Sequence, residues 1–230
     1  MIILTGVSGG VGKKIFKGLS KIDNIIGIYN SNKPSFNFLS KKCSIQKIDL
    51  LNESTITSFI DTFLTKEKKI TLIHLASLKS EKLLINYDIN DIKNEFDVNF
   101  FAPTFFSKKI IPIMAANNWG RIIFFSSTGG EKGDIGTASY TASKMSLLGL
   151  SRVISIEYAK FNITSNVIRL GNFDTGMYKK LSKDKQKELL KLVPSKKLGN
   201  FKDIVTTIKM IIDSDYINNT EVNIDGGMRR

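Results

Sequence analysis

The sequence predicts a doubly wound α/β fold, in which a parallel sheet of about seven strands is covered by helices on both faces. Short apolar runs of four to seven residues alternate with longer amphipathic stretches from one end of the chain to the other. The apolar runs are nearly continuous, which is typical of strands buried on both faces of a parallel sheet. The amphipathic stretches between them supply the helical crossovers that parallel strands require.

The predicted strands are rich in Ile, Val, Leu or Phe, and the predicted helices have apolar residues at helical spacing. The first half of the chain reads strand Ile2–Thr5, helix Gly12–Ser20, strand Ile25–Tyr29, strand Ser44–Ile48, helix Ser54–Leu64 and strand Ile70–Leu75. The second half reads helix Ile89–Ala116, strand Gly120–Ser126, helix Tyr140–Ala159, strand Thr164–Arg169, helices Lys179–Leu192 and Lys202–Asp213, and strand Glu221–Ile224. Since no linker, composition shift or internal repeat divides them, residues 1–230 are expected to form one domain.

Length and composition narrow the classes of protein. A chain of 230 residues buries enough surface to need neither disulfides nor a structural metal. One cysteine, Cys43, excludes an intramolecular disulfide framework, and a single histidine, His74, argues against a metal site, so no metal is expected. The first residues do not form a signal peptide and no apolar run is long enough to cross a bilayer, so the expected location is the cytoplasm, away from the membrane.

The charge balance is strongly basic, with 34 Lys+Arg against 21 Asp+Glu and a formal net charge of +13. The densest lysine cluster, 179–191, is interleaved with leucines at helical spacing and is therefore interpreted as the solvated face of an amphipathic helix. Nucleic acid is not an expected partner, because only the charge supports it. The excess is expected to solvate the surface and to attract anionic cofactors, substrates or carriers in general.

A glycine-rich turn directly follows the first predicted strand. It reads Thr5-Gly6-Val7-Ser8-Gly9-Gly10-Val11-Gly12 and leads into the first predicted helix. In a doubly wound sheet this position binds a dinucleotide, because the glycines allow close backbone approach and the helix N-terminus faces the pyrophosphate. Glycines also mark ordinary tight turns, so the signal is weak by itself and gains weight from its place at the start of the chain.

The second signal is Tyr140-Thr141-Ala142-Ser143-Lys144. On a helix, Tyr140 and Lys144 share one face, and a nearby ammonium is expected to lower the phenol pKa so that Tyr140 can transfer a proton. Ser127, just after the strand that ends at Ser126, is expected beside the ligand crevice, where its hydroxyl can polarise a carbonyl oxygen. A Tyr–Lys pair four residues apart also occurs by chance on many helices.

Together the glycine turn and the Ser, Tyr and Lys residues resemble the short-chain dehydrogenase/reductase family, in its short single-domain branch, and are similar to its 3-oxoacyl-(acyl-carrier-protein) reductase-like members. Four further segments are similar to motifs of this family: Asp49-Leu50, Asn99 in Asp97-Val98-Asn99-Phe100, Gly171 with Thr175, and Val222-Asn223-Ile224-Asp225-Gly226-Gly227. The chain departs from the family at His74-Leu75-Ala76-Ser77, where Asn-Asn-Ala-Gly is usual, and at Leu170, where Pro is usual. His74 is interpreted as structural.

The resemblance implies a Rossmann fold and an oxidoreductase that moves a hydride between a nicotinamide cofactor and a carbonyl or secondary alcohol. It implies a catalytic set of Ser127 holding the substrate oxygen, Tyr140 exchanging the proton, Lys144 binding the nicotinamide ribose, and Asn99 carrying a water that connects Lys144 to solvent. The implied cofactor-binding residues are Thr5, Gly6, Ser8, Gly10, Val11, Gly12, Asn30, Ser31, Asp49, Leu50, Ala76, Tyr140, Lys144, Gly171, Phe173 and Thr175.

The end of the second predicted strand favours NADP(H) over NAD(H). The segment Ile28-Tyr29-Asn30-Ser31-Asn32-Lys33 contains no acid that would bind the ribose 2′-hydroxyl and repel a 2′-phosphate, and Lys33 is near enough to attract one. Against this preference, Gly9 stands where many NADP-dependent members carry Arg in the turn. Lys13 either compensates for that Arg or is simply an exposed helix residue.

The substrate is left open. Residues 173–198 correspond to the family's mobile substrate lid. One candidate is a 3-oxoacyl group on acyl carrier protein, although Asn118 and Phe161 stand where such reductases commonly present Arg to the carrier. The other is an oxo or hydroxyl group of a sugar or other anionic metabolite.

Two further expectations concern function class and assembly. The alternative to an enzyme is a non-catalytic dinucleotide-binding or sensor protein that retains the fold. The resemblance also implies a homotetramer, or at least a homodimer, through helices Ile89–Ala116 and Tyr140–Ala159. Their apolar residues equally suit the protein core: Phe100, Phe101, Phe105, Phe106, Leu147, Leu148 and Leu150.

Overall fold

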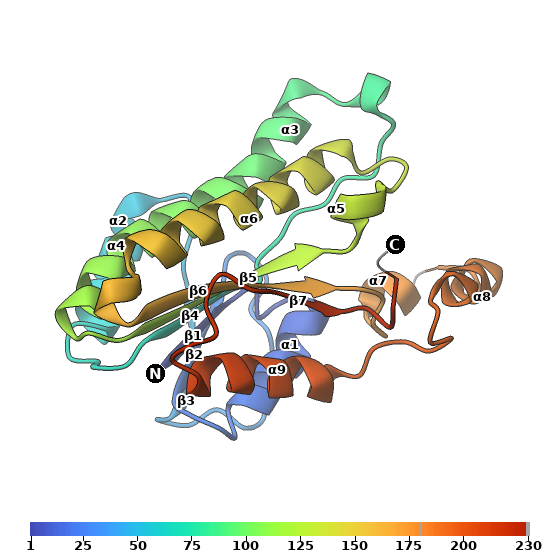
Figure 1. Ribbon diagram of the computed structural model, residues 1–230. Helices are drawn as coiled ribbons and strands as arrows, with labels where there is room; N and C mark the ends of the chain where they lie inside the picture. The colour runs from blue at the N-terminus through green and yellow to red at the C-terminus, as the bar shows by residue number, and fades with distance from the viewer. Residues whose placement is uncertain (180, 229–230) are drawn as a thin grey trace.

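The computed structural model describes residues 1–179 and 181–228, together with the backbone but not the side chains of 131, 132, 176 and 177. In these residues seven parallel strands form one sheet in the order β3-β2-β1-β4-β5-β6-β7 (Figure 1). The strands are β1 (Ile2–Thr5), β2 (Ile25–Tyr29), β3 (Cys43–Lys47), β4 (Thr71–His74), β5 (Gly120–Ser127), β6 (Ile163–Leu170) and β7 (Glu221–Ile224). The predicted doubly wound parallel sheet is confirmed, and each strand lies within one residue of its predicted bounds.

Helices cover both faces of the sheet, as Figure 1 shows. Helices α1 (Gly10–Leu19) and α9 (Phe201–Asp213) lie on one face, and their apolar residues form one core cluster with the sheet. The opposite face carries α2 (Glu53–Phe63), α4 (Ala102–Ala116) and α6 (Ala138–Glu157) and forms the second cluster. The strands are therefore buried on both faces, which explains their continuous apolar sequences.

The predicted single helix Ile89–Ala116 is wrong in one respect, because it is interrupted. It consists of α3 (Ile89–Phe96), a π-helical turn η2 (Asp97–Phe101), and α4, with Pro103 in the first turn of α4. Proline has no backbone N–H, so the carbonyl of Asn99, four residues earlier, has no α-helical donor. Such π insertions are frequent at functional sites, and this one contains Asn99.

The predicted lid helix Lys179–Leu192 also divides. Helix α7 (Gly176–Lys179) is separate from α8 (Lys183–Leu192), whose N-terminus is capped by the side chain of Ser182. Lys180 lies outside the described residues. Three short elements were not predicted: the 3-10 turns η1 (Leu84–Asn86) and η3 (Ala159–Phe161), and helix α5 (Gly129–Lys132). Figure 1 places α5, α7 and α8 at the carboxyl end of the strands.

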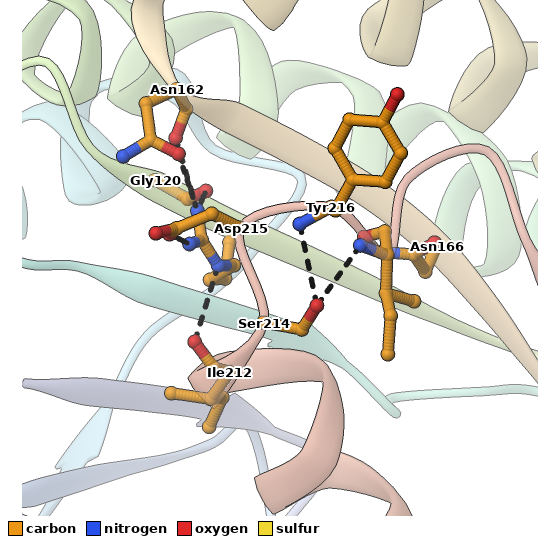
Figure 2. A network of polar contacts seen from close by, with 9 residues as sticks. Gly120, Asn162, Asn166, Ile212, Ser214, Asp215 and Tyr216 are labelled. Atoms are coloured by element: carbon orange, nitrogen blue, oxygen red, sulfur yellow. Dashed lines mark hydrogen bonds and ion pairs between the residues drawn. The ribbon is translucent and has the colours of Figure 1, made fainter.

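The amino end of the sheet is held by a buried arginine in β5. Arg121 donates to the carbonyls of Gly120 (2.8 Å), Asn162 (3.0 Å) and Ile212 (3.3 Å), and it pairs with Asp215. Figure 2 shows these partners converging from β5, the turn before β6 and the end of α9. The guanidinium therefore joins three separate chain segments and stabilises the amino end of the sheet.

Two further properties follow from the described residues. None of the helices among them has the length and apolar character to cross a membrane. The part of the chain that the structure describes also contains no group of three or more His, Cys, Asp or Glu residues placed to hold a metal ion.

Candidate active site

The candidate site lies where the strand order reverses, between β1 and β4. Thr5, the last residue of β1, is fully buried, and its hydroxyl accepts hydrogen bonds from the backbone N–H groups of Leu75 (3.1 Å) and Ala76 (3.0 Å). Thr5 was expected to bind the cofactor. In the structure its hydroxyl instead holds the backbone of the segment after β4, so Thr5 positions that segment against the glycine turn. Ligands of doubly wound sheets bind in the crevice at this switch point.

The glycine turn has the close backbone approach that a pyrophosphate needs. Gly6 has φ +78°, and a Cβ there would lie 2.7 Å from the backbone of Ala76; a Cβ on Gly12 would lie 2.1 Å from the Gly6 carbonyl oxygen. Among the described side chains none caps the N-terminus of α1, and its first turn, which includes Gly10 and Val11, contains no acid. The open N–H groups therefore suit an anion, and Ser8 is half-buried in the same turn.

The ends of β2 and β3 border the same crevice. Asn30 and Ser31 follow β2 and are exposed, free to contact a ligand. Asp49 is also exposed, and its Oδ1 accepts from the N–H of Leu51 (3.0 Å), whereas Leu50 is half-buried against the core. The close backbone of the turn and the uncapped N-terminus of α1 fit the pyrophosphate of a dinucleotide.

The segment after β6 approaches from the other side of the switch point. Gly171 donates to the carbonyl of Ile224 (3.0 Å), and a Cβ there would lie 2.7 Å from Asp225. Phe173 is buried, with its ring 5.5 Å from that of Phe201, so only its backbone remains for a cofactor. Thr175 is half-buried and donates through its N–H to the Phe173 carbonyl (2.7 Å).

Ser127 and Tyr140 face each other, as the sequence predicts. Ser127 ends β5, and Tyr140 lies in the first turn of α6. Burial raises the pKa of the Tyr140 phenol, while the hydroxyls of Ser77 and Ser127, which hydrogen-bond to it, act in the opposite direction. Sequence analysis missed Ser77, which occupies the position where the family usually has Gly.

Lys144 is buried, and its Nζ donates to the backbone carbonyl of Phe125 (2.9 Å). Burial lowers the pKa of Lys144 to about 8. The expectation that Lys144 lowers the pKa of Tyr140 is wrong for this structure. Burial of the phenol outweighs the groups that favour the phenolate, and the ammonium is directed to a carbonyl in β5.

Asn99 is fully buried, and both polar atoms of its side-chain amide are hydrogen-bonded. Its Nδ2 donates to the carbonyl of Leu78 (2.8 Å) and to the hydroxyl of Ser143 (2.9 Å), and its Oδ1 accepts from the N–H of Leu78 (2.8 Å). Ser143 donates in turn to the carbonyl of Tyr140 (2.8 Å). Asn99 therefore joins the segment after β4 to the first turn of α6, and the sequence pattern gave no sign of the Ser143 contact.

His74 is buried behind the site. Its ring stacks on Phe124 with centroids 5.1 Å apart, and its Nε2 is 3.1 Å from the hydroxyl of Ser107. Burial, with a smaller effect of the Lys144 ammonium, lowers the pKa of His74 to about 3. A neutral, enclosed imidazole agrees with its structural interpretation.

Glu95 is a second residue near the site that sequence analysis missed. It is fully buried in α3, and its Oε1 accepts from the backbone N–H of Ser80, whereas its Oε2 has no hydrogen-bond partner among the described residues. The sequence gives no indication that this isolated acid in a short amphipathic helix is buried and bonded to the segment after β4.

Comparison with known proteins identifies the family. A family model described as short chain dehydrogenase matches residues 1–186. The 3-oxoacyl-(acyl-carrier-protein) reductase of Buchnera aphidicola subsp. Baizongia pistaciae is 32% identical over 98% of this chain and 96% of its own. The reductase of that name from Rickettsia felis is 28% identical over 98% and 95%. The solved structure of ElxO with NADP bound has a TM-score of 0.90 at 22% identity, covering 99% of this chain and 97% of its own.

The family match spans most of the chain, including every residue of the candidate catalytic set. The chain belongs to the short-chain dehydrogenase family, whose members are oxidoreductases that bind a nicotinamide cofactor.

Proposed function

We propose that the protein is a cytoplasmic, NADP(H)-dependent reductase of small carbonyl compounds, with Tyr140 as the proton donor. The observation that carries the proposal is the convergence of Tyr140, Ser127 and buried Lys144 at the carboxyl end of β5, beside the glycine turn. The nicotinamide, when bound, supplies the hydride. The residues of this chain supply the oxygen-binding groups and the proton.

The protonation state of Tyr140 suits its assigned role as a proton donor. A phenol whose pKa is raised stays protonated at neutral pH, so Tyr140 donates a proton to the oxygen that gains charge as a carbonyl is reduced. Ser127 binds that oxygen through its hydroxyl. Lys144, with a pKa of about 8, carries a proton that it can give up near neutrality, and it is assigned to the ribose and to reprotonation of the phenol.

The relay to solvent is assigned to the backbone of Asn99. Its side-chain amide is occupied by Leu78 and Ser143. Its carbonyl has no α-helical donor, because Pro103 stands four residues later. That carbonyl is therefore assigned to the water that connects Lys144 to solvent.

The NADP(H) preference is supported by the exposed, acid-free segment at Asn30 and Ser31. A 2′-phosphate meets no carboxylate there, and Lys33 is exposed two residues further on. The NADP-bound neighbour is consistent with this choice. The dissociation constants of NADPH and NADH for the purified protein test it, and tighter binding of NADH contradicts it.

Assembly belongs to the same proposal. Seven apolar residues of the two long helices were expected either in the core or in a contact between copies of the chain. Phe106, Leu147 and Leu148 are buried in the core, whereas Phe101 and Phe105 are 44% and 41% exposed. Exposed Val153 and Ile156 lie on the neighbouring helix α6. We assign these four residues to contacts between copies of the chain, as a homodimer or homotetramer.

Replacing Tyr140 by Phe tests the catalytic assignment. The variant is expected to lose about a hundredfold to ten-thousandfold in kcat/KM for carbonyl reduction, the usual contribution of a general acid. NADPH binding, followed by fluorescence titration, should persist. Tyr216→Phe is the matched control, because Tyr216 is 98% exposed and follows Asp215 at the amino end of the sheet, opposite the candidate site. Retained turnover in Tyr140→Phe contradicts the assignment, and cofactor binding without turnover of any carbonyl compound by the unmodified protein supports the non-catalytic alternative.

A further inference from the structure

The segment after β4 holds one lysine, Lys79, in a fixed position. On one side of it, both backbone polar groups of Leu78 are bonded to the Asn99 amide, each at 2.8 Å. On the other side, the N–H of Ser80 is bonded to the buried carboxylate of Glu95. Because the backbone is hydrogen-bonded at both neighbouring residues, the main-chain position of Lys79 is constrained, whereas its side chain can still move.

The Lys79 ammonium lies against the candidate proton donor. Its Nζ is 5.7 Å from the centroid of the Tyr140 ring, which is within the range of a cation–π contact. The Lys79 side chain is 27% exposed, so the ammonium is at the opening of the site and not inside the core. A substrate whose carbonyl oxygen meets Tyr140 therefore passes close to this cation.

In the structure the ammonium is already paired with a carboxylate. Glu81 Oε1 is 2.6 Å from Lys79 Nζ, and the Glu81 side chain is 70% exposed. An ion pair with such an exposed partner contributes little to stability, so another carboxylate can replace Glu81 at small cost. The pair also shows that the ammonium can bind a carboxylate.

A second lysine, on helix α8, acts on the same carboxylate. Lys79 lowers the pKa of Glu81, and the charge of Lys185, in the first turns of α8, acts in the same direction. Glu81 thus lies within the field of cations from two elements that are distant in sequence. An anion that takes its place meets both.

We propose that Lys79 is a specificity-determining residue that binds the carboxylate of a small oxo acid, with Glu81 occupying the ammonium until substrate displaces it. This inference rests on the proposed function, since it places the carbonyl of the oxo acid at Tyr140. Lys185 adds long-range attraction for the same anion. The substrate class is therefore carbonyl compounds with a carboxylate a few bonds away from the reacting carbon.

Matched acid and ester substrates test the inference in the full-length protein with NADPH. The pairs are pyruvate with methyl pyruvate and levulinate with methyl levulinate, and the measured quantity is the ratio of kcat/KM for acid over ester. Lys79→Met is expected to lower this ratio by about tenfold or more, the size of one charge-assisted hydrogen bond. Glu81→Gln is expected to raise it, because the competing carboxylate is removed.

Lys82→Met is the matched control. Lys82 is in the same segment and is also ion-paired, with Asp91 at 2.5 Å. Its removal changes the net charge equally and should leave the acid-to-ester ratio unchanged. An equal fall of the ratio in both variants shows a general charge effect and overturns the assignment to Lys79.

A binding measurement separates this inference from the proposed function. Saturation-transfer NMR of butyrate with the protein and NADP⁺ should give a signal that Lys79→Met loses and Lys82→Met keeps. That result without turnover of any of the four carbonyl compounds contradicts the proposed function and supports the anion site. Turnover with the same acid-to-ester ratio in Lys79→Met and unmodified protein, or equal butyrate signals in the two, overturns the anion site and leaves the reductase assignment in place.

Discussion

At the scale of single residues, burial changes the ionisation of the side chains behind and within the site. Tyr140, Lys144 and His74 are each shifted toward their neutral forms, mainly because an enclosed environment disfavours charge. Tyr140 is thereby kept as an acid. Lys144 titrates close to physiological pH, and His74 stays neutral.

The pKa of Lys144 predicts an alkaline limit to carbonyl reduction. The ammonium loses its proton as the pH rises through about 8, whereas the Tyr140 phenol, with its pKa above the usual value, stays protonated there. If the cation is required, kcat/KM for reduction should fall above pH about 8, and this parameter reports groups of the free enzyme. The profile measured from pH about 6 to about 10 checks this. A profile that is flat up to pH about 10 contradicts the role of Lys144.

His74 predicts a loss of stability in acid. Its pKa is about 3 in the folded protein against 6.5 in the unfolded chain, so the unfolded state binds the proton first. The contribution is complete above pH about 6.5 and is lost as the pH falls toward about 3. It amounts to about 2 kcal/mol between pH about 6.5 and about 5.

Denaturant unfolding of His74→Asn tests this effect. Asn keeps a donor and an acceptor for Ser107 and does not titrate, so the free energy of unfolding should depend less on pH than in the unmodified protein. Equal slopes for the two proteins between pH about 6.5 and about 5 contradict the prediction.

At the scale of elements, the turn between β1 and α1 and the π-helical turn η2 determine the geometry of the site. The glycine turn brings backbone against backbone at Gly6 and Gly12. The π-helical turn directs Asn99 toward Leu78 and Ser143, so that one side chain connects three elements. Both features depend on backbone conformations that ordinary helices and strands do not supply.

Substituting Gly12 by Ala tests the turn. The added Cβ would lie 2.1 Å from the Gly6 carbonyl oxygen, so the backbone must move. The affinity for NADPH should fall by about tenfold or more, since the N–H groups leave their positions around the pyrophosphate. Fluorescence titration measures this.

Gly149→Ala is the control for helix propensity. Gly149 is an exposed residue of α6 with open space around its Cβ position, so Ala there should raise stability by about 0.5–1 kcal/mol and leave cofactor affinity unchanged. Equal NADPH affinities for Gly12→Ala and the unmodified protein would show that the turn does not bind the cofactor.

At the scale of the whole molecule, the two ends of the sheet differ: one carries a structural network and the other carries the candidate site. The amino end is fixed by Arg121 and its partners (Figure 2). The carboxyl end carries the glycine turn, Ser127, Tyr140 and the helical segments α5, α7 and α8 (Figure 1). In the proposed anion site, part of the net charge of +13 has a specific role, because the Lys79 ammonium lies against the Tyr140 ring.

The exposed apolar residues of η2, α4 and α6 predict association. Phe105→Lys combined with Ile156→Lys should reduce the mass in solution toward the 25.7 kDa of a single chain. The substitutions place two charges in the proposed contact, where association would have to remove their water, so association is disfavoured. Light scattering after size exclusion measures the mass, and Met210→Lys on α9 is the control. An unmodified protein that is monomeric at all concentrations contradicts the proposal.

The sequence by itself determined the fold class and the bounds of the strands, and it supplied the candidate catalytic set, because these depend on local patterns. Buried parallel strands are continuous apolar runs, the glycine turn is contiguous, and Tyr140 and Lys144 are four residues apart on one helix. Such signals need no knowledge of distant segments.

Only the tertiary structure decided what depends on contacts between distant segments. The interruption of the helix at Asn99, the Ser77 hydroxyl at Tyr140, the Glu95 bond to Ser80 and the position of Lys79 over the Tyr140 ring all join residues from different elements. The direction of the Tyr140 pKa shift was also decided there. The sequence showed an ammonium four residues away, but the degree of burial and the direction of the Lys144 side chain toward Phe125 are set by packing.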